Sequence, residues 1–181
     1  MPIIQASRPV FAPIALECKS NELIYLPGIK VGNMLSVSTA ENFIIAPNFA
    51  GGKAHIKDAA IALNTSSIPI SAYELMFGEI VNGNEIIDPP AVGVWGGFGY
   101  IEGAINMNCD YEVTVTWINR VIFTPPPIAG VSRYNGSVTL TTPSISGRAY
   151  LDGTGKWRKR AVFGSPKEAI KYLKSKAGII K

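Results

Sequence analysis

YEVTVTWINRVIF, residues 111–123, alternates apolar and polar side chains along its first half. One face would carry Tyr111, Val113, Val115 and Trp117, and the opposite face would carry Glu112, Thr114 and Thr116. Successive side chains of a β-strand point to opposite faces of the sheet, and β-branched and aromatic residues suit that pleated surface. The pattern therefore predicts a half-buried strand with a polar outer face.

The segments before this strand also have strand length. Glycine and proline total 31 residues (18 and 13) and divide residues 1–146 into short pieces, as in sandwiches and barrels. Asn82-Gly83-Asn84 between residues 73–81 and 85–87 predicts a hairpin, whereas residues 54–63 suit a strand or a helix. We expect a mainly β fold, with a β-sandwich or jelly-roll-like body and an extended, proline-interrupted N-terminal arm.

The last 35 residues differ in character. Residues 148–151 and 156–163 flank Asp152-Gly153-Thr154-Gly155, which predicts a β-hairpin. Ser165-Pro166-Lys167-Glu168 then predicts a helix start with a capping box, and the helix should run to about Lys176, before Gly178. We therefore divide the chain into a β-sandwich-like domain, 1–146, and a basic unit of one hairpin and one α-helix, 147–181.

Charge follows the same division. Residues 1–146 hold 7 Lys/Arg and 11 Asp/Glu, a net of −4, and residues 147–181 hold 10 and 2, a net of +8. The candidate partner-binding patch is Lys156, Trp157, Arg158, Lys159, Arg160, Lys167, Lys171 and Lys174. Such a patch suits an acidic protein surface, including the acidic part of a second copy, or nucleic acid, with Trp157 stacking on a base. Simple solvation of a basic tail stays open.

A glycine-rich segment, residues 93–99, precedes the regular strand. It matches neither a phosphate-binding loop nor a dinucleotide fingerprint. Alternating glycine and aromatic residues favour a strand or loop that another part of the chain approaches closely. Trp95, Phe98 and Tyr100 are candidate contact aromatics for a sugar or base, and core packing is the alternative.

Reactive side chains form no recognised motif. His55 is the only histidine, and Cys18 and Cys109 lie 91 positions apart, so we expect no metal, no cofactor and no catalytic residues. Paired carboxylates drawn from Glu102, Asp110 and Glu112 leave a hydrolytic site open. No run of 18 apolar residues and no signal-peptide pattern occur, so we expect no membrane partner and a cytoplasmic location unless the chain belongs to a virion.

The prolines at 2, 9 and 13, the strand 111–123, the Pro125–Pro127 elbow and the basic C-terminal unit together resemble virion structural proteins of tailed bacteriophages. The resemblance implies a capsid-decoration, head–tail connecting or tail protein, and it carries over no catalytic residue. We expect a non-enzymatic assembly protein whose partners are other protein subunits, in a homo-oligomer or lattice. A nucleic-acid-binding module and a carbohydrate-binding β-protein are the alternatives.

Overall fold

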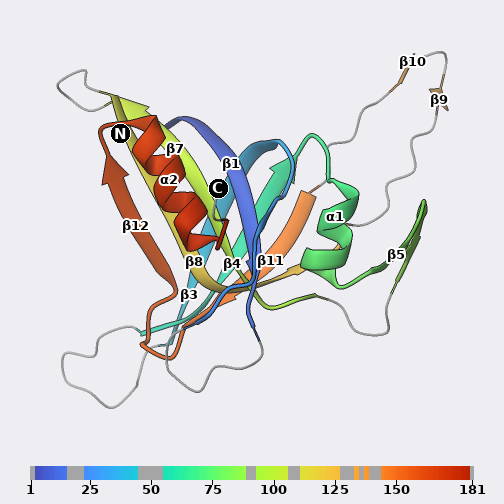
Figure 1. Ribbon diagram of the computed structural model, residues 1–181, viewed down its shortest axis with the longest axis horizontal. Coiled ribbons are helices and arrows are strands. Elements are labelled where there is room, and N and C mark those ends of the chain that lie inside the picture. Colours follow the sequence, from blue (N-terminus) through green and yellow to red (C-terminus); the bar gives the residue numbers. More distant parts are fainter. Residues whose placement is uncertain are drawn as a thin grey trace.

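The computed structural model describes residues 3–15, 23–44, 55–88, 93–105, 111–126, 133–134, 137–138 and 144–179. The fold is mainly β, as predicted (Figure 1). The strands are β1 (Ile3–Pro13), β2 (Ile29–Lys30), β3 (Met34–Ile44), β4 (His55–Thr65), β5 (Ile80–Asn82), β6 (Glu85–Ile87), β7 (Gly96–Ile105), β8 (Tyr111–Thr124), β9 (Arg133–Tyr134), β10 (Ser137–Val138), β11 (Ser144–Tyr150) and β12 (Arg158–Phe163). The helical segments are α1 (Ile70–Ala72), the π-helical turn η1 (Tyr73–Phe77) and α2 (Pro166–Lys176).

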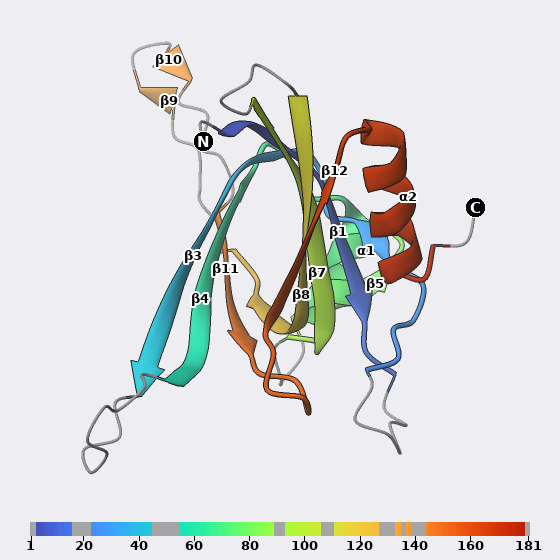
Figure 2. The same ribbon diagram turned by 90° about the vertical axis from the view of Figure 1, so that its left-hand side faces the viewer.

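An eight-stranded antiparallel sheet forms the body, in the order β2-β1-β7-β8-β11-β4-β3, with β12 also paired to β8. The sheet bends around a core, and its two halves face each other in a sandwich-like arrangement (Figure 2). That core contains Phe11 of β1, Leu63 of β4, Phe98 of β7 and Ile145 of β11, each 0% exposed. The N-terminal segment, predicted as an extended arm, forms β1, which pairs with β7 along its length.

The predicted C-terminal hairpin is wrong. β11 pairs with residues 120–124 of β8, and β12 continues in the same direction along residues 113–118 of β8. Both segments are therefore antiparallel to β8 and follow one another along a single edge, because this 14-residue strand is long enough for both. Residues 151–157 make an excursion between them. The boundary predicted between residues 146 and 147 falls inside β11.

A bulge in β8 divides the buried side chains between two cores. Gly96 pairs with Val121 and Phe98 with Ile118, so two residues of β8 lie opposite Gly97 alone. A bulge of this kind shifts the alternation of side chains by one. Before it, Val113, Val115 and Trp117 face α2, and after it, Val121 and Phe123 face the core inside the sheet. The predicted polar outer face is wrong for Thr116, which is 1% exposed.

Helix α2 covers the outer face of β7, β8 and β12, as Figures 1 and 2 both show. Its predicted bounds are confirmed: Pro166 is the first helical residue, and Gly178 has a left-handed φ of 66° just after the C-cap. Ala169 and Leu173 are buried against β8, and Phe163 of β12 packs on Tyr172. The capping box is wrong, since Ser165 makes no side-chain capping hydrogen bond.

The other local predictions were partly correct. Residues 55–65 form strand β4, which decides between the two readings of that segment. The hairpin around Asn82-Gly83-Asn84 is present as β5 and β6, but residues 73–77 are the π-helical turn η1. The start of the predicted strand 73–81 is helical, and its Met76 and Phe77 are buried in the core inside the sheet. Cys18 and Cys109 lie outside the described residues.

Candidate interaction surfaces

The predicted basic patch is divided between opposite faces of the sheet. Arg158 and Arg160 share one face of β12, as predicted, and this is the inner face, where Arg158 donates to Glu41 of β3 at 3.3 Å. Burial raises the pKa of the Glu102 carboxyl on β7, and the positive charges of Arg160 and Arg158 oppose that rise. These two arginines therefore face carboxylates of their own chain.

Trp157 is not available for stacking on a base. Its side chain is 6% exposed and belongs to the core inside the sheet, and the Arg158 guanidinium lies 4.4 Å from the centre of its ring. The aromatic residues of the glycine-rich segment are similar, since Phe98 and Tyr100 are 0% and 5% exposed. Trp95 is the exception at 37%, with Arg120 stacked 4.5 Å from its ring centre.

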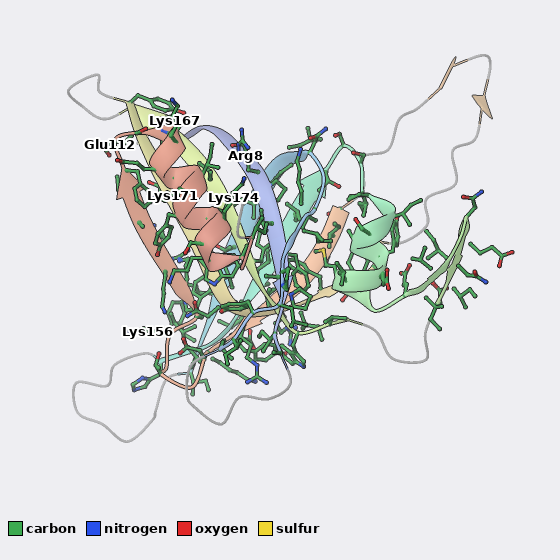
Figure 3. The ribbon with its side chains drawn as sticks, viewed as in Figure 1. Arg8, Glu112, Lys156, Lys167, Lys171 and Lys174 are labelled. Atoms are coloured by element: carbon green, nitrogen blue, oxygen red, sulfur yellow. The ribbon has the colours of Figure 1, made fainter. Side chains whose placement is uncertain are left out.

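The helix lysines occupy the outer side of the molecule. Lys167, Lys171 and Lys174 are exposed along α2, and Figure 3 shows Lys156 at the far end of β12 from Lys167. The eight predicted residues therefore lie in three places: the inner face, the core, and the surface on and beside α2. The sequence placed them together because it showed their order and not the direction of each side chain.

Lys156, Lys159 and Lys176 line a small polar hollow of about 330 Å³ beside the 151–157 excursion. Asn119, at the bulge of β8, holds this excursion: its main-chain N–H donates to the carbonyl of Trp157 at 2.9 Å, and its side-chain amide donates to Asp152 Oδ2 at 2.8 Å. Asp152 Oδ1 accepts from the Thr154 hydroxyl at 2.7 Å and from the N–H groups of Thr154 and Lys156, both at 2.9 Å.

These hydrogen bonds set the charge state of Asp152. Burial acts to raise the pKa of this carboxyl, but the donors from Lys156, Thr154 and Asn119 outweigh it, and its pKa lies below the ordinary value. A carboxyl whose pKa is lower in the folded state binds fewer protons there than in the unfolded chain. Its contribution to stability is therefore present above the unfolded pKa, near 3.9, and is lost as the pH falls through the lower folded value.

We expect Asp152→Asn to lower the free energy of unfolding by about 1 kcal/mol at neutral pH, because the half-exposed site loses charge-assisted hydrogen bonds. The difference from the wild type should shrink as the pH falls below about 4. Urea unfolding at neutral and acid pH measures it, with Glu74→Gln, at an exposed carboxylate on η1, as the control. A difference that does not change with pH would contradict the role given to the ionised carboxylate.

A larger groove, of about 640 Å³, lies between β1, the β2–β3 connection and α2. Its floor is apolar and includes Val10 and Met34, both 8% exposed, and Leu173, 2% exposed. Three cationic side chains from three separate elements line it: Arg8, Lys30 and Lys174. None of the lining residues that the structure describes is acidic.

Sequence reasoning missed this groove. Arg8 and Lys30 lie in the net acidic part of the chain, and only the fold brings them to Lys174. Arg8 has a left-handed φ of 54°, the only positive φ of a non-glycine residue in the described segments, and it sits where the β1–β7 register shifts between Ser7 and Val10. Such strained backbone concentrates at functional sites.

Exposed apolar residues gather in two peripheral places. The hairpin of β5 and β6 stands away from the main sheet (Figure 1), and its Ile80, Ile86 and Ile87 are 56%, 42% and 46% exposed. At the far end of β3, Phe43 and Ile44 are 55% and 52% exposed. Both places are strands, so they offer main-chain hydrogen-bonding groups as well as apolar side chains.

No family model and no curated protein matches this chain. Within the segments that the structure describes, no three His, Cys, Asp or Glu side chains are grouped as metal ligands would be. No helix in those segments is long and apolar enough to cross a membrane.

Proposed function

We propose that this chain is a structural subunit that assembles with further copies of itself, and that it acts by binding and not by catalysis. The proposal rests on the β5–β6 hairpin, in which three isoleucine side chains are exposed to solvent. A two-stranded hairpin is marginally stable alone, and contiguous exposed apolar residues mark protein–protein contact sites. A neighbouring subunit that covers the isoleucines would stabilise the hairpin and remove its apolar surface from water.

The edges of the main sheet support the same proposal. Among the described strands, β3 ends the sheet on one side, and its 11 residues include no lysine, arginine or proline, the residues that usually protect a free edge. Its single charged residue, Glu41, accepts from Arg158. β12 provides the contrast, because Arg158, Lys159 and Arg160 place three positive charges in succession on its strand. An unprotected edge suits a subunit that meets other chains in its working state.

More specifically, we propose that the chain is a structural component of a virion. This proposal rests on the resemblance to virion structural proteins of tailed bacteriophages and on the surfaces just described. The rival functions have less support: Trp157 is buried, which removes the aromatic partner expected for a nucleic-acid base, and of the three candidate sugar-binding aromatics only Trp95 is exposed. Cofactor-free binding to other protein subunits is therefore the function we propose.

Sedimentation velocity on the full chain over a wide concentration range tests the proposal. We expect a defined oligomer or a growing series of oligomers, and we expect the association to weaken in Ile87→Asp. That substitution buries a carboxylate in any contact made by the face of the hairpin that carries Ile80 and Ile87, whereas Ile87 is already 46% exposed in the single chain. Val162→Asp, at an apolar residue of β12 that is 61% exposed, is the control. A monomer at every concentration would overturn the proposal.

A further inference from the structure

The groove between β1 and α2 has the features of a site for an acidic, extended segment with apolar side chains. Arg8 and Lys30 lie on the paired strands β1 and β2, and Lys174 lies on α2. The floor between them is formed by Val10, Met34 and Leu173. A carboxylate would gain from Arg8 and Lys30, and an apolar side chain would gain from the floor.

The main chain of β1 adds a second feature. β2 pairs with β1 only at Val10 and Phe11, and Val31 then donates its N–H to the carbonyl of Pro9 at 2.9 Å. At Gly32, with a φ of 113°, the chain turns away from β1. Along residues 3–8 of β1, no strand in the described part of the chain pairs with the edge on the groove side. Among the described strands, none therefore occupies the place where β2 would have continued, and an added strand there would hydrogen-bond to the main chain of β1.

The chain itself contains a segment with the matching chemistry. Residues 80–88, the β5–β6 hairpin and the residue after it, include the exposed carboxylates Glu85 and Asp88 and no basic residue. Ile80 pairs directly with Ile87, and Glu85 lies two residues from Ile87, so one face of the hairpin presents two apolar side chains and a carboxylate. Each three-residue strand spans about 10 Å, and the free part of β1 about 20 Å, so the hairpin fits within it.

We infer that the groove of one copy receives the β5–β6 hairpin of a second copy, in a head-to-tail contact; this inference rests on the proposed function. Figure 1 shows α2 and the hairpin at opposite ends of the long axis of the molecule, so a copy cannot fill its own groove. The contact therefore uses two different surfaces, and such a contact repeats from copy to copy into a ring or a filament. Lys30 and Arg8 attract Glu85, and Ile80 and Ile87 cover Val10 and Leu173.

The experiment uses two variants of the full chain, each damaged on one surface only. The groove variant is Arg8→Gly with Lys30→Glu; glycine suits the left-handed backbone at position 8, so the fold is retained. The hairpin variant is Ile80→Lys with Ile87→Lys, at two side chains already exposed in the single chain. Lys171→Glu, on the same helix but outside the groove, is the matched charge control. Circular dichroism of each variant checks that it is folded.

Sedimentation velocity should show that each variant alone associates at least roughly tenfold more weakly than the wild type. An equal mixture of the two variants should form a one-to-one dimer, because the groove variant still has a working hairpin and the hairpin variant a working groove. Lys171→Glu should assemble like the wild type, and the wild type should dissociate as the salt concentration rises.

The outcomes separate the two proposals. A monomeric wild type overturns the proposed function and this inference together. If the wild type and both variants assemble equally well, the proposed function stands and the head-to-tail contact is overturned. The partner surface would then be the β3 edge or an acidic segment of another protein. Variants that fail alone and also fail when mixed overturn the pairing of these two surfaces.

Discussion

Trp117→Ala is expected to lower the free energy of unfolding by about 3–5 kcal/mol. The indole is 1% exposed and lies between β7 and α2, over Gly97 and Gly99, where any added Cβ would overlap its ring. Its Nε1 donates to the hydroxyl of Tyr25 at 3.3 Å, and the two rings meet edge to face with centres 5.2 Å apart. Alanine would leave a cavity lined by glycines, which have no side chain to fill it.

Chemical denaturation followed by circular dichroism measures this loss. Trp95→Ala is the control, since its ring is 37% exposed and contacts Tyr150 and Arg120 at the surface. That substitution should cost no more than about 1 kcal/mol. Similar losses at the two tryptophans would show that α2 and its supporting strands do not pack around Trp117 as described.

Gly32→Ala is expected to lower the free energy of unfolding by about 3 kcal/mol or more. Gly32 has a φ of 113°, which L side chains rarely adopt, and a Cβ there would overlap the main-chain oxygen of Ser67. Main-chain atoms of a connection cannot rotate away as a flexible side chain can. The substitution should therefore displace the segment that leads from β2 into β3 and reshape the groove beside it.

Gly83→Ala separates the cost of a side chain at a left-handed φ from the cost of the overlap with Ser67. Gly83 also has a left-handed φ, 61°, but a Cβ at this hairpin turn has no atom within 4 Å. The free energy of unfolding should therefore fall only by the cost of placing alanine in a left-handed conformation, about 1 kcal/mol. Thermal or urea unfolding of both variants compares them, and equal losses would contradict the overlap with Ser67.

Elements with a local signal could be predicted from the sequence. The alternation in residues 111–123 predicted β8, and Ser165, Pro166 and Gly178 predicted the ends of α2, because periodicity and helix ends depend on neighbours in the chain. The fold beyond these elements depends on pairing. A turn at residues 152–155 predicted a hairpin, but β11 and β12 both bind β8, which lies tens of residues earlier.

The candidate surfaces were harder to predict for the same reason. The run at 156–160 is continuous in sequence, yet Trp157 enters the core and Arg158 turns to Glu41 on β3. In the groove, by contrast, the fold brings together Arg8, Lys30 and Lys174, which lie far apart in the sequence. No pattern in the sequence marks Arg8, because its left-handed backbone arises from the register shift between β1 and β7.

The shared edge of β8 also sets the order in which the molecule can open. β8 has neighbours on both edges, whereas β12 pairs only with β8 among the described strands. The C-terminal unit of β12 and α2 can therefore separate from the sheet while β11 remains hydrogen-bonded to β8 and β4. Native-state hydrogen exchange should show this as an early-opening unit, with the amides of β12 losing protection before those of β8 and β11. A pulling force applied at the C-terminus would peel away the same unit first.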